Sequence, residues 1–251
     1  MKVIMKKSDR AGLFWQSIVG QLAAFLTMPL GFLFVRLMGY RIRDLKKVRA
    51  EVKRIYREHK GPWLICPNHL TMIDSVVISY GLFSLFDHAF RFRDIPWNLP
   101  ERKNFHRNFL LVIVCYLMKC IPVDRGGSRE GVQRLLDKCI QVLDWRQSLL
   151  VFPEGKRSRA GKVDRENFSY GVGRLIDEQK ETRVLLVYFR GDGQQTYGSI
   201  PRFGEHFTIA LETLTPQRAE SGGLRVQRAY AAEIVEKLAD MEEGYFASRG
   251  Q

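Results

Sequence analysis

A histidine and an aspartate stand five residues apart in segment 68–74, directly after a short apolar run. A neutral imidazole is suited to removing a proton from a hydroxyl near pH 7. A carboxylate bonded to the other ring nitrogen would select the tautomer and stabilise the imidazolium. The spacing therefore predicts His69 as a general base that Asp74 orients. On spacing alone, a loop histidine followed by an aspartate in the first helical turn fits as well.

Two later segments could bind an anion. Arg125 follows a short apolar stretch and precedes two glycines, and its guanidinium could hold a phosphate through two hydrogen bonds. Segment 152–159 reads Phe-Pro-Glu-Gly-Lys-Arg-Ser-Arg. There Gly155 permits close approach of a ligand or an unusual backbone angle, and Arg157 supplies positive charge. Glu154 could bond a substrate hydroxyl or position the arginine. Each segment alone also fits an ordinary solvated turn.

The elements that must position these side chains alternate along the chain. Apolar runs predict strands over 63–66, 120–123, 148–152, 183–189 and 207–214. Helical periodicity predicts an amphipathic helix over 44–59, a buried helix over 109–118, and further helices over 72–86, 128–144, 168–178 and 229–241. The alternation predicts an α/β fold with a mixed, mostly parallel sheet flanked by helices. All three segments follow strands, so we expect them at the carboxyl edge of one sheet.

The N-terminal region carries a different signal. Residues 11–35 contain no formal charge, and at about 1.5 Å per residue they could span a hydrocarbon core of about 30 Å. Basic residues flank both ends, which suits a helix or helical hairpin that dips into one leaflet and returns; a single spanning helix is the alternative. Pro29 could kink or break the segment. A cleavable signal peptide fits poorly, because the run is too long.

Composition limits the partners and the cellular compartment. The 251 residues carry a net charge of +13, which favours an anionic partner: nucleic acid, an anionic bilayer or a phosphorylated substrate. We expect no nucleic-acid partner, because no recognised binding module is present. The cysteines show neither a disulfide framework nor zinc spacing, so we expect reduced thiols, no metal and a domain that faces the cytoplasm. They are Cys66, Cys115, Cys120 and Cys139.

Taken in order, these segments resemble the glycerolipid acyltransferase family, typified by 1-acyl-glycerol-3-phosphate acyltransferases. The family's first block is His-x4-Asp, usually preceded by Asn, and matches at 68–74. The second is an apolar strand that ends in arginine and matches at 121–125. The third is Phe-Pro-Glu-Gly-Thr-Arg-Ser and matches at 152–158, with Lys156 in place of the threonine. The fourth is a strand with an internal proline, which 184–188 lacks.

The resemblance covers roughly residues 60–190 and implies a mechanism. His69 would take the proton of an acceptor hydroxyl, which attacks the thioester of acyl-CoA or acyl carrier protein, while Asp74 orients the imidazole. The thioester is a co-substrate, and no cofactor or metal is implied. Four residues of the later blocks would hold the acceptor, most simply through a phosphate: Arg125, Glu154, Gly155 and Arg157.

The expected acceptor is a lysophospholipid, foremost 1-acyl-glycerol-3-phosphate in phospholipid biosynthesis. The altered third and fourth blocks leave other acceptors open: a lyso-ornithine lipid, a glycolipid or glycerol 3-phosphate. A non-catalytic membrane lipid-binding protein is a further alternative, although a carrier needs no base. We expect residues 1–40 to form a membrane-anchoring helical segment and residues 41–251 an acyltransferase domain on the cytoplasmic face of an anionic membrane.

Overall fold

The computed structural model describes residues 5–105, 108–217, 219 and 222–250. Within this part of the chain six strands form one sheet, in the order β1-β6-β5-β2-β4-β3. The strands are β1 (Arg41–Ile42), β2 (Trp63–Pro67), β3 (Trp97–Asn98), β4 (Leu149–Leu150), β5 (Arg183–Gly191) and β6 (His206–Leu214). The helices are α1 (Lys7–Leu37), α2 (Leu45–Glu58), α3 (Asp74–Leu82), α4 (Leu85–Phe90), α5 (Arg102–Phe105), α6 (Phe109–Leu117), α7 (Arg129–Asp144), α8 (Gly171–Glu178) and α9 (Leu224–Ala247). The first four residues of the expected anchor segment, and 106–107 of the expected loop before α6, lie outside the described residues.

The sheet is mixed, as the alternation of elements predicts, and curls into a half-barrel. β2 lies at its centre and pairs in parallel with β4 and β5, and β3 pairs in parallel with β4. β6 runs antiparallel to β5, and β1 pairs in parallel with β6. The parallel pairing of β2, β4 and β3 places their carboxyl ends at one edge, which is where the chemistry-bearing segments follow.

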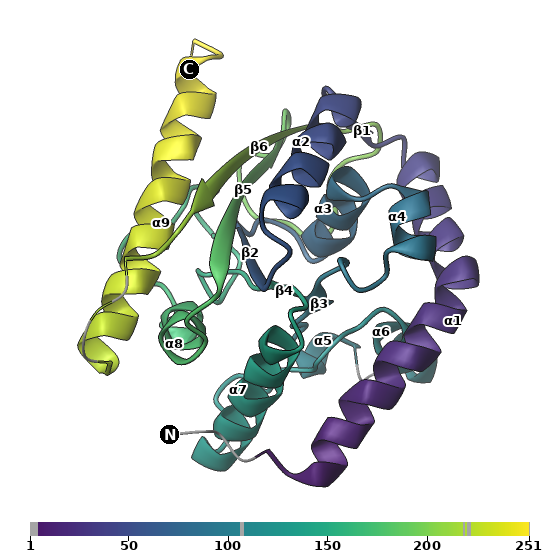
Figure 1. Ribbon diagram of the computed structural model, residues 1–251. Helices are drawn as coiled ribbons and strands as arrows, with labels where there is room; N and C mark the ends of the chain where they lie inside the picture. The colour runs from purple at the N-terminus through teal and green to yellow at the C-terminus, as the bar shows by residue number, and fades with distance from the viewer. Residues whose placement is uncertain (1–4, 106–107, 218, 220–221, 251) are drawn as a thin grey trace.

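Helices cover both faces of the sheet, and the strands divide their side chains between two cores. On one face Ile65 and Leu185 pack with the helices α1, α2 and α3. On the other face Leu64 and Leu186 pack with α7, α8 and α9. Alternate residues of a strand point to opposite faces, so a central strand needs apolar residues throughout. All five residues of β2 are accordingly buried. Figure 1 shows α1 and α9 on opposite sides of the sheet.

Two expected elements are broken in the structure. The helix expected over 72–86 is two helices, α3 and α4, because the chain is extended at Phe83 and Ser84. Ser84 and Asp87 form a capping box that starts α4. The strand expected over 120–123 is present only as isolated bridges from Cys120 to Asn98 and from Val123 to Glu101.

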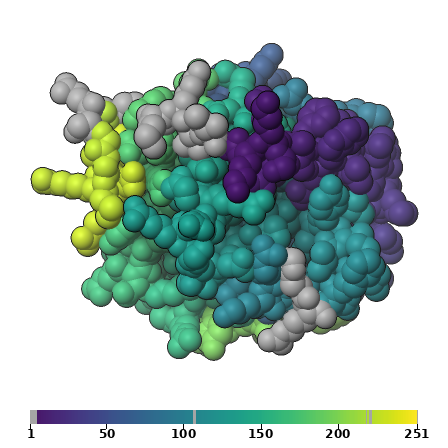
Figure 2. Space-filling model, turned by 90° about the horizontal axis from the view of Figure 1, so that it is seen from below, coloured from purple at the N-terminus to yellow at the C-terminus, as the bar shows by residue number. Residues whose placement is uncertain are grey.

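α1 is one continuous helix that contains Pro29, so the structure holds neither the break nor the helical hairpin that the sequence left open. By length and composition alone it could cross a membrane. One stripe of the helix, which includes Leu13, Ala24 and Met28, is buried against the rest of the chain. Most of its other apolar side chains, such as Leu22 at 72% exposure, are open to solvent. Figure 2 shows α1, in purple, lying open on the surface.

The helix expected over 109–118 forms as α6, but the expectation that it is buried is wrong. Phe109 is 77% exposed and Leu110 is 68% exposed. α6 packs against α1, where Gly20 allows close approach: a Cβ there would lie 2.7 Å from the carbonyl oxygen of Leu117. α5 also contacts α6, but the outer side of α6 stays exposed. The exposed faces of α1 and α6 therefore place many apolar side chains on the surface.

Candidate active site

The loop between β2 and α3 brings the histidine and the aspartate together. The Nδ1 atom of His69 lies 3.1 Å from Oδ2 of Asp74, the first residue of α3. The same carboxylate oxygen accepts hydrogen bonds from the amides of Leu70 at 2.7 Å and Thr71 at 2.8 Å, and Thr71 Oγ1 donates to the other oxygen, Oδ1. Three donors besides the imidazole thus fix a carboxylate that is only 1% exposed.

The imidazole is oriented for use as a base. Because a carboxylate accepts hydrogen bonds, it favours the tautomer with the proton on Nδ1 and leaves Nε2 with a lone pair. Nε2 of His69 has no hydrogen-bond partner within the described residues, and the side chain is 12% exposed. The ring stacks on Phe152, with centroids 3.8 Å apart and planes 19° apart. The pair predicted from spacing is therefore present, and Phe152 restrains its histidine.

Segment 152–158 is hydrogen-bonded to the backbone of the histidine segment 68–74. The amide of His69 donates to Oε1 of Glu154 at 3.0 Å, and the amide of Ser158 donates to the carbonyl oxygen of His69 at 2.8 Å. Glu154 is only 3% exposed, so its contact in the structure is with the histidine segment. Burial raises the pKa of Glu154 to about 7, and the charges of Glu242 and Asp164 add to this, while the amide of His69 opposes it.

Gly155 has the unusual backbone angle that the sequence allowed. Its φ is +66°, in the left-handed region that favours glycine. A Cβ at this position would lie 3.0 Å from the Cβ of Ser169, which is closer than such atoms normally approach. The glycine thus lets the chain turn sharply between Glu154 and the two cations that follow it.

Arg157 lies beside a loop that covers the histidine segment. Its Nη1 donates to the carbonyl oxygen of Gly198 at 2.9 Å, and its guanidinium lies 5.6 Å from the ring centroid of Tyr197. The amide of Gly198 donates to the carbonyl oxygen of Leu70 at 3.0 Å, so the same loop contacts both blocks. Lys156 forms an ion pair of 3.2 Å with Asp164 instead. The structure therefore brings Arg157, but not the Lys156 ammonium, to the loop beside His69.

Arg125 follows Val123 at the same edge of the sheet but farther out. Successive strands lie about 4.8 Å apart, so the three steps from β2 through β4 and β3 to segment 120–123 amount to roughly 14 Å. Arg125 is about half exposed, and its Nε lies 3.7 Å from Oε2 of Glu101. Within the described part of the chain no contact joins it to His69 or Arg157. The structure thus brings the first and third blocks into contact with each other, whereas Arg125 lies to one side of them.

Two further residues of the first block support the site, although the sequence alone assigns neither of them a role. Asn68 exchanges two hydrogen bonds with the backbone of Phe189: its Nδ2 donates at 3.0 Å and its Oδ1 accepts at 2.7 Å. It thereby ties the end of β2 to β5. Thr71 bonds Asp74 twice, as described above. The sequence places the asparagine before the histidine in the block but does not reveal its bond to β5, and the hydroxyl of Thr71 within the block is the signal that could have identified the second residue.

Comparison with known proteins agrees with this geometry. A search of curated proteins gives no match. A family model described as Acyltransferase matches residues 41–186. The matched region is more than half of the chain; it includes the His69–Asp74 pair and block 152–158 and leaves α1 outside. The chain therefore belongs to this family, that of the glycerolipid acyltransferases, and is an acyltransferase enzyme.

Proposed function

We propose that this enzyme transfers a fatty acyl group from acyl-CoA or acyl carrier protein to the hydroxyl of a lysophospholipid, foremost 1-acyl-glycerol-3-phosphate, during phospholipid biosynthesis. The observation that carries the proposal is the contact of 3.1 Å between His69 Nδ1 and Asp74, because it leaves Nε2 available to a substrate. The chemistry supports acyl transfer in general, and the choice of acceptor rests on the cations near the site.

The residues permit a single displacement without an acyl-enzyme. Nε2 of His69 accepts the proton of the acceptor hydroxyl while the hydroxyl oxygen attacks the carbonyl carbon of the thioester. The tetrahedral intermediate collapses, the C–S bond breaks, and the imidazolium returns its proton to the departing thiolate. Asp74 stabilises the imidazolium between these two transfers. Proton transfer by a positioned base accounts for about 10²–10⁴ of such a rate enhancement.

The acceptor's phosphate would be held by Arg157 and Arg125, which flank the base. Arg157 is the nearer candidate, because the loop to which its guanidinium donates also contacts Leu70. Arg125 reaches in from the outer strands, and its long contact with Glu101 would be replaced by the phosphate. A phosphate between two guanidiniums forms charge-assisted hydrogen bonds, which are roughly twice as strong as neutral ones. No metal or cofactor enters this scheme.

We place the enzyme at an anionic membrane, with residues 41–251 on the cytoplasmic face. The exposed apolar side chains of α1 suit a helix that lies in the interface while its buried stripe holds the domain. A net charge of +13 adds attraction to anionic headgroups. The reduced thiols of Cys66 and Cys139 suit the cytoplasmic side. This arrangement would bring a lysolipid to His69 without leaving the bilayer surface.

An acceptor panel tests the proposal. Purified enzyme in mixed micelles is given labelled acyl-CoA or acyl carrier protein and, separately, 1-acyl-glycerol-3-phosphate, a lyso-ornithine lipid, a glycolipid and glycerol 3-phosphate. We expect the diacyl product from the first acceptor, lost in His69→Ala and retained in His206→Ala, which changes an exposed histidine on β6. Preference for another acceptor would contradict the proposed substrate, and transfer by His69→Ala at the normal rate would contradict the proposed base.

A further inference from the structure

A groove of about 540 Å³ lies between α1, α2, α3 and α4, apart from the candidate active site. Apolar side chains of α1 and α4 form its walls, and two arginines, Arg36 from α1 and Arg49 from α2, join them. The wall residues include Phe32, Leu33, Leu85 and Phe86. The groove thus combines cations with apolar walls.

Arg49 is held in place but is not neutralised. Its Nη2 donates to the carbonyl oxygen of Tyr80 at 2.6 Å, and its guanidinium lies 5.8 Å from the ring centroid of Phe32 and 5.3 Å from that of Tyr80. Its buried Nε has no hydrogen-bond partner among the described residues. Burial lowers the pKa of Arg49 and the charge of Arg36 lowers it further, against the opposing effects of Tyr80 and Asp87. An anion at this place would offset both the cost of burying the Arg49 guanidinium and its repulsion by Arg36.

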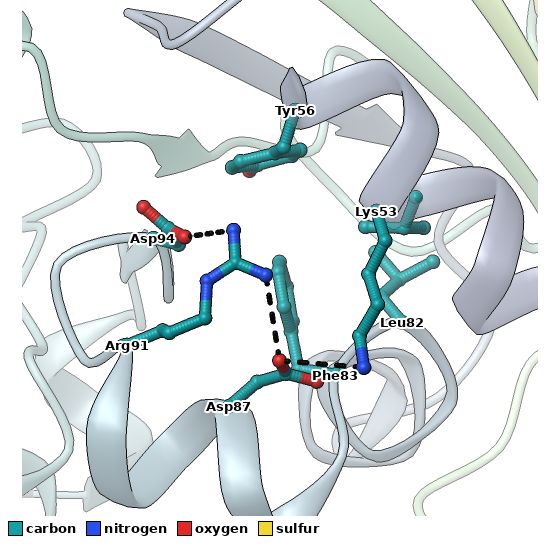
Figure 3. A pocket seen from close by; sticks show the side chains of 8 residues that line it. Lys53, Tyr56, Leu82, Phe83, Asp87, Arg91 and Asp94 are labelled. Atoms are coloured by element: carbon teal, nitrogen blue, oxygen red, sulfur yellow. Dashed lines mark ion pairs between the residues drawn. The ribbon is translucent and has the colours of Figure 1, made fainter.

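A neighbouring hollow shows the opposite arrangement. There Lys53 and Arg91 lie 3.7 Å and 3.6 Å from the buried carboxylate of Asp87, and Arg91 also pairs with Asp94, as Figure 3 shows. The cations of that hollow are balanced within the protein. In the groove, by contrast, neither Arg36 nor Arg49 forms an ion pair with any described residue. Among the described residues the fold therefore leaves two guanidiniums close together without an ion-pair partner of their own, and Asp87 acts on Arg49 only at longer range.

The surroundings of the groove indicate what supplies that charge. Leu33 and Leu37 on α1 are 49% and 66% exposed, and Phe86 and Phe90 on α4 are 63% and 65% exposed. A soluble anion would satisfy the arginines but would leave this apolar surface in water. A phospholipid satisfies both, because its phosphate carries the charge and its chains can cover the apolar rim.

We propose that this groove binds one anionic phospholipid of the bilayer, with its headgroup phosphate between Arg36 and Arg49 and its acyl chains along α1 and α4. This lipid is not the acceptor, because the groove lies at the C-terminal end of α3 while Asp74 begins that helix. Six residues at about 1.5 Å each separate Asp74 from Tyr80, the residue of α3 that lines the groove, so the two lie roughly 9 Å apart along the helix. The site would fix the position of the enzyme on the membrane, whatever acceptor it uses.

Flotation of the full-length protein with vesicles tests this site without any acyl-transfer assay. The vesicles contain phosphatidylcholine alone, or four parts phosphatidylcholine to one part phosphatidylglycerol. Arg57→Gln is the matched control, since Arg57 is an exposed arginine later on α2. We expect the double variant Arg36→Gln/Arg49→Met to lose about 30-fold in binding to the anionic vesicles, Arg36→Gln alone about five-fold, and the control at most about two-fold.

Three results would overturn the proposal. Equal losses in Arg36→Gln and Arg57→Gln would mean that only overall charge matters. An unchanged preference for anionic vesicles in the double variant would remove the arginines from lipid binding. Binding of inorganic phosphate by wild type and not by the double variant, together with vesicle binding that millimolar phosphate leaves unchanged, would identify a site for soluble phosphate instead of lipid. If the double variant fails to fold, Arg36→Gln decides the matter, because Arg36 is exposed and makes no hydrogen bond through its side chain to a described residue.

Discussion

The two ends of the same sheet edge are built in different ways. At β2, three donors hold the carboxylate of Asp74, and Phe152 and Asp74 restrain the ring of His69. Beyond β3, Arg125 is about half exposed, and its carboxylate contact within the described residues is 3.7 Å long. The group that would move a proton is thus fixed by the fold, whereas the group that would bind an anion is free to adjust.

The difference has an energetic reason. A base that is already oriented need not reorganise in the transition state, so its contribution to the rate is not reduced by that cost. An exposed ion pair contributes about 0–1 kcal/mol, so a phosphate can displace Glu101 from Arg125 with little loss. Substitutions at the β2 end should therefore reduce turnover, and substitutions at the β3 end should weaken acceptor binding.

The largest effect is expected at His69. His69→Ala removes the base and should lower kcat by about 10³-fold, because positioned proton transfer is worth about 10²–10⁴. The side chain stacks on Phe152 at the surface of the site, so the fold should persist. Steady-state rates and a thermal melt of the same sample measure both effects. A kcat within about ten-fold of wild type, with the melt unchanged, would place the base elsewhere.

Asp74→Asn should have the next largest effect. The neutral amide cannot stabilise the imidazolium, and with its oxygen in the place of Oδ2 its nitrogen cannot accept from Thr71 Oγ1, so we expect a fall in kcat of about 10²-fold. We also expect a loss of about 2 kcal/mol in the free energy of unfolding, since buried donors lose their acceptor. Rate assays and urea unfolding test this. The control is Asp44→Asn, an exposed aspartate before α2; a rate loss as large in the control would refute the assignment.

Arg125→Gln should act on binding alone. We expect the KM for a phosphate-bearing acceptor to rise about ten-fold, as for one charge-assisted contact of about 1.4 kcal/mol, with kcat within two-fold. Arg102→Gln is the matched control, because Arg102 lies at the same edge and bonds Asp124 at 2.9 Å. A fall in kcat with no change in KM would show that the β3 end also contributes to turnover, and the contrast between the two ends would fail.

Glu154→Gln should have little effect on rate and a pH-dependent effect on stability. The pKa of Glu154 is raised from 4.5 to about 7, so the folded protein binds this proton more tightly than the unfolded chain. Its contribution to stability is therefore greatest below pH 4.5, falls as the pH rises to about 7, and is constant above that. The glutamine keeps the acceptor for the amide of His69.

Relative to wild type, the free energy of unfolding of Glu154→Gln should consequently gain about 3 kcal/mol between pH 4.5 and pH 8. Urea unfolding at both values measures this gain. Glu166→Gln, at an exposed position in the following loop, should show no such trend. A stability difference that does not depend on pH would mean that burial does not disfavour the charge of Glu154.

The sequence predicts the β2 end of the site better than the β3 end. The His-x4-Asp spacing determines the contact directly, because five residues bridge a strand end and the first helical turn. The place of Arg125 depends on how β2, β4 and β3 are ordered, and that order follows from long-range pairing. No local pattern encodes the distance between Arg125 and His69, so the sequence could predict a common edge but not a shared contact.

The exposure of α6 and its packing on α1 share a physical cause. Hydrophobicity shows that a side chain avoids water, but it does not distinguish a protein core from a lipid surface. α6 was therefore expected to be buried, although Phe109 and its neighbours are exposed. Gln16 is a polar residue within the apolar segment of α1, and its Nε2 donates to the carbonyl oxygens of Tyr116 and Cys120 at 3.0 and 2.9 Å. It thereby gives hydrogen-bond donors to carbonyl oxygens at and just after the end of α6. No pattern within α1 could reveal this contact.

The hydrogen bonds of Gln16 restrict the movement of α1. With Gly20 this glutamine fastens α1 to the end of α6, so the N-terminal helix cannot swing away without breaking two hydrogen bonds and opening a tight contact. A helix fastened along its length cannot act as a flexible tether. At the bilayer surface proposed above, the enzyme would keep a constant height and tilt, so the fold itself would set the distance between His69 and the lipid headgroups.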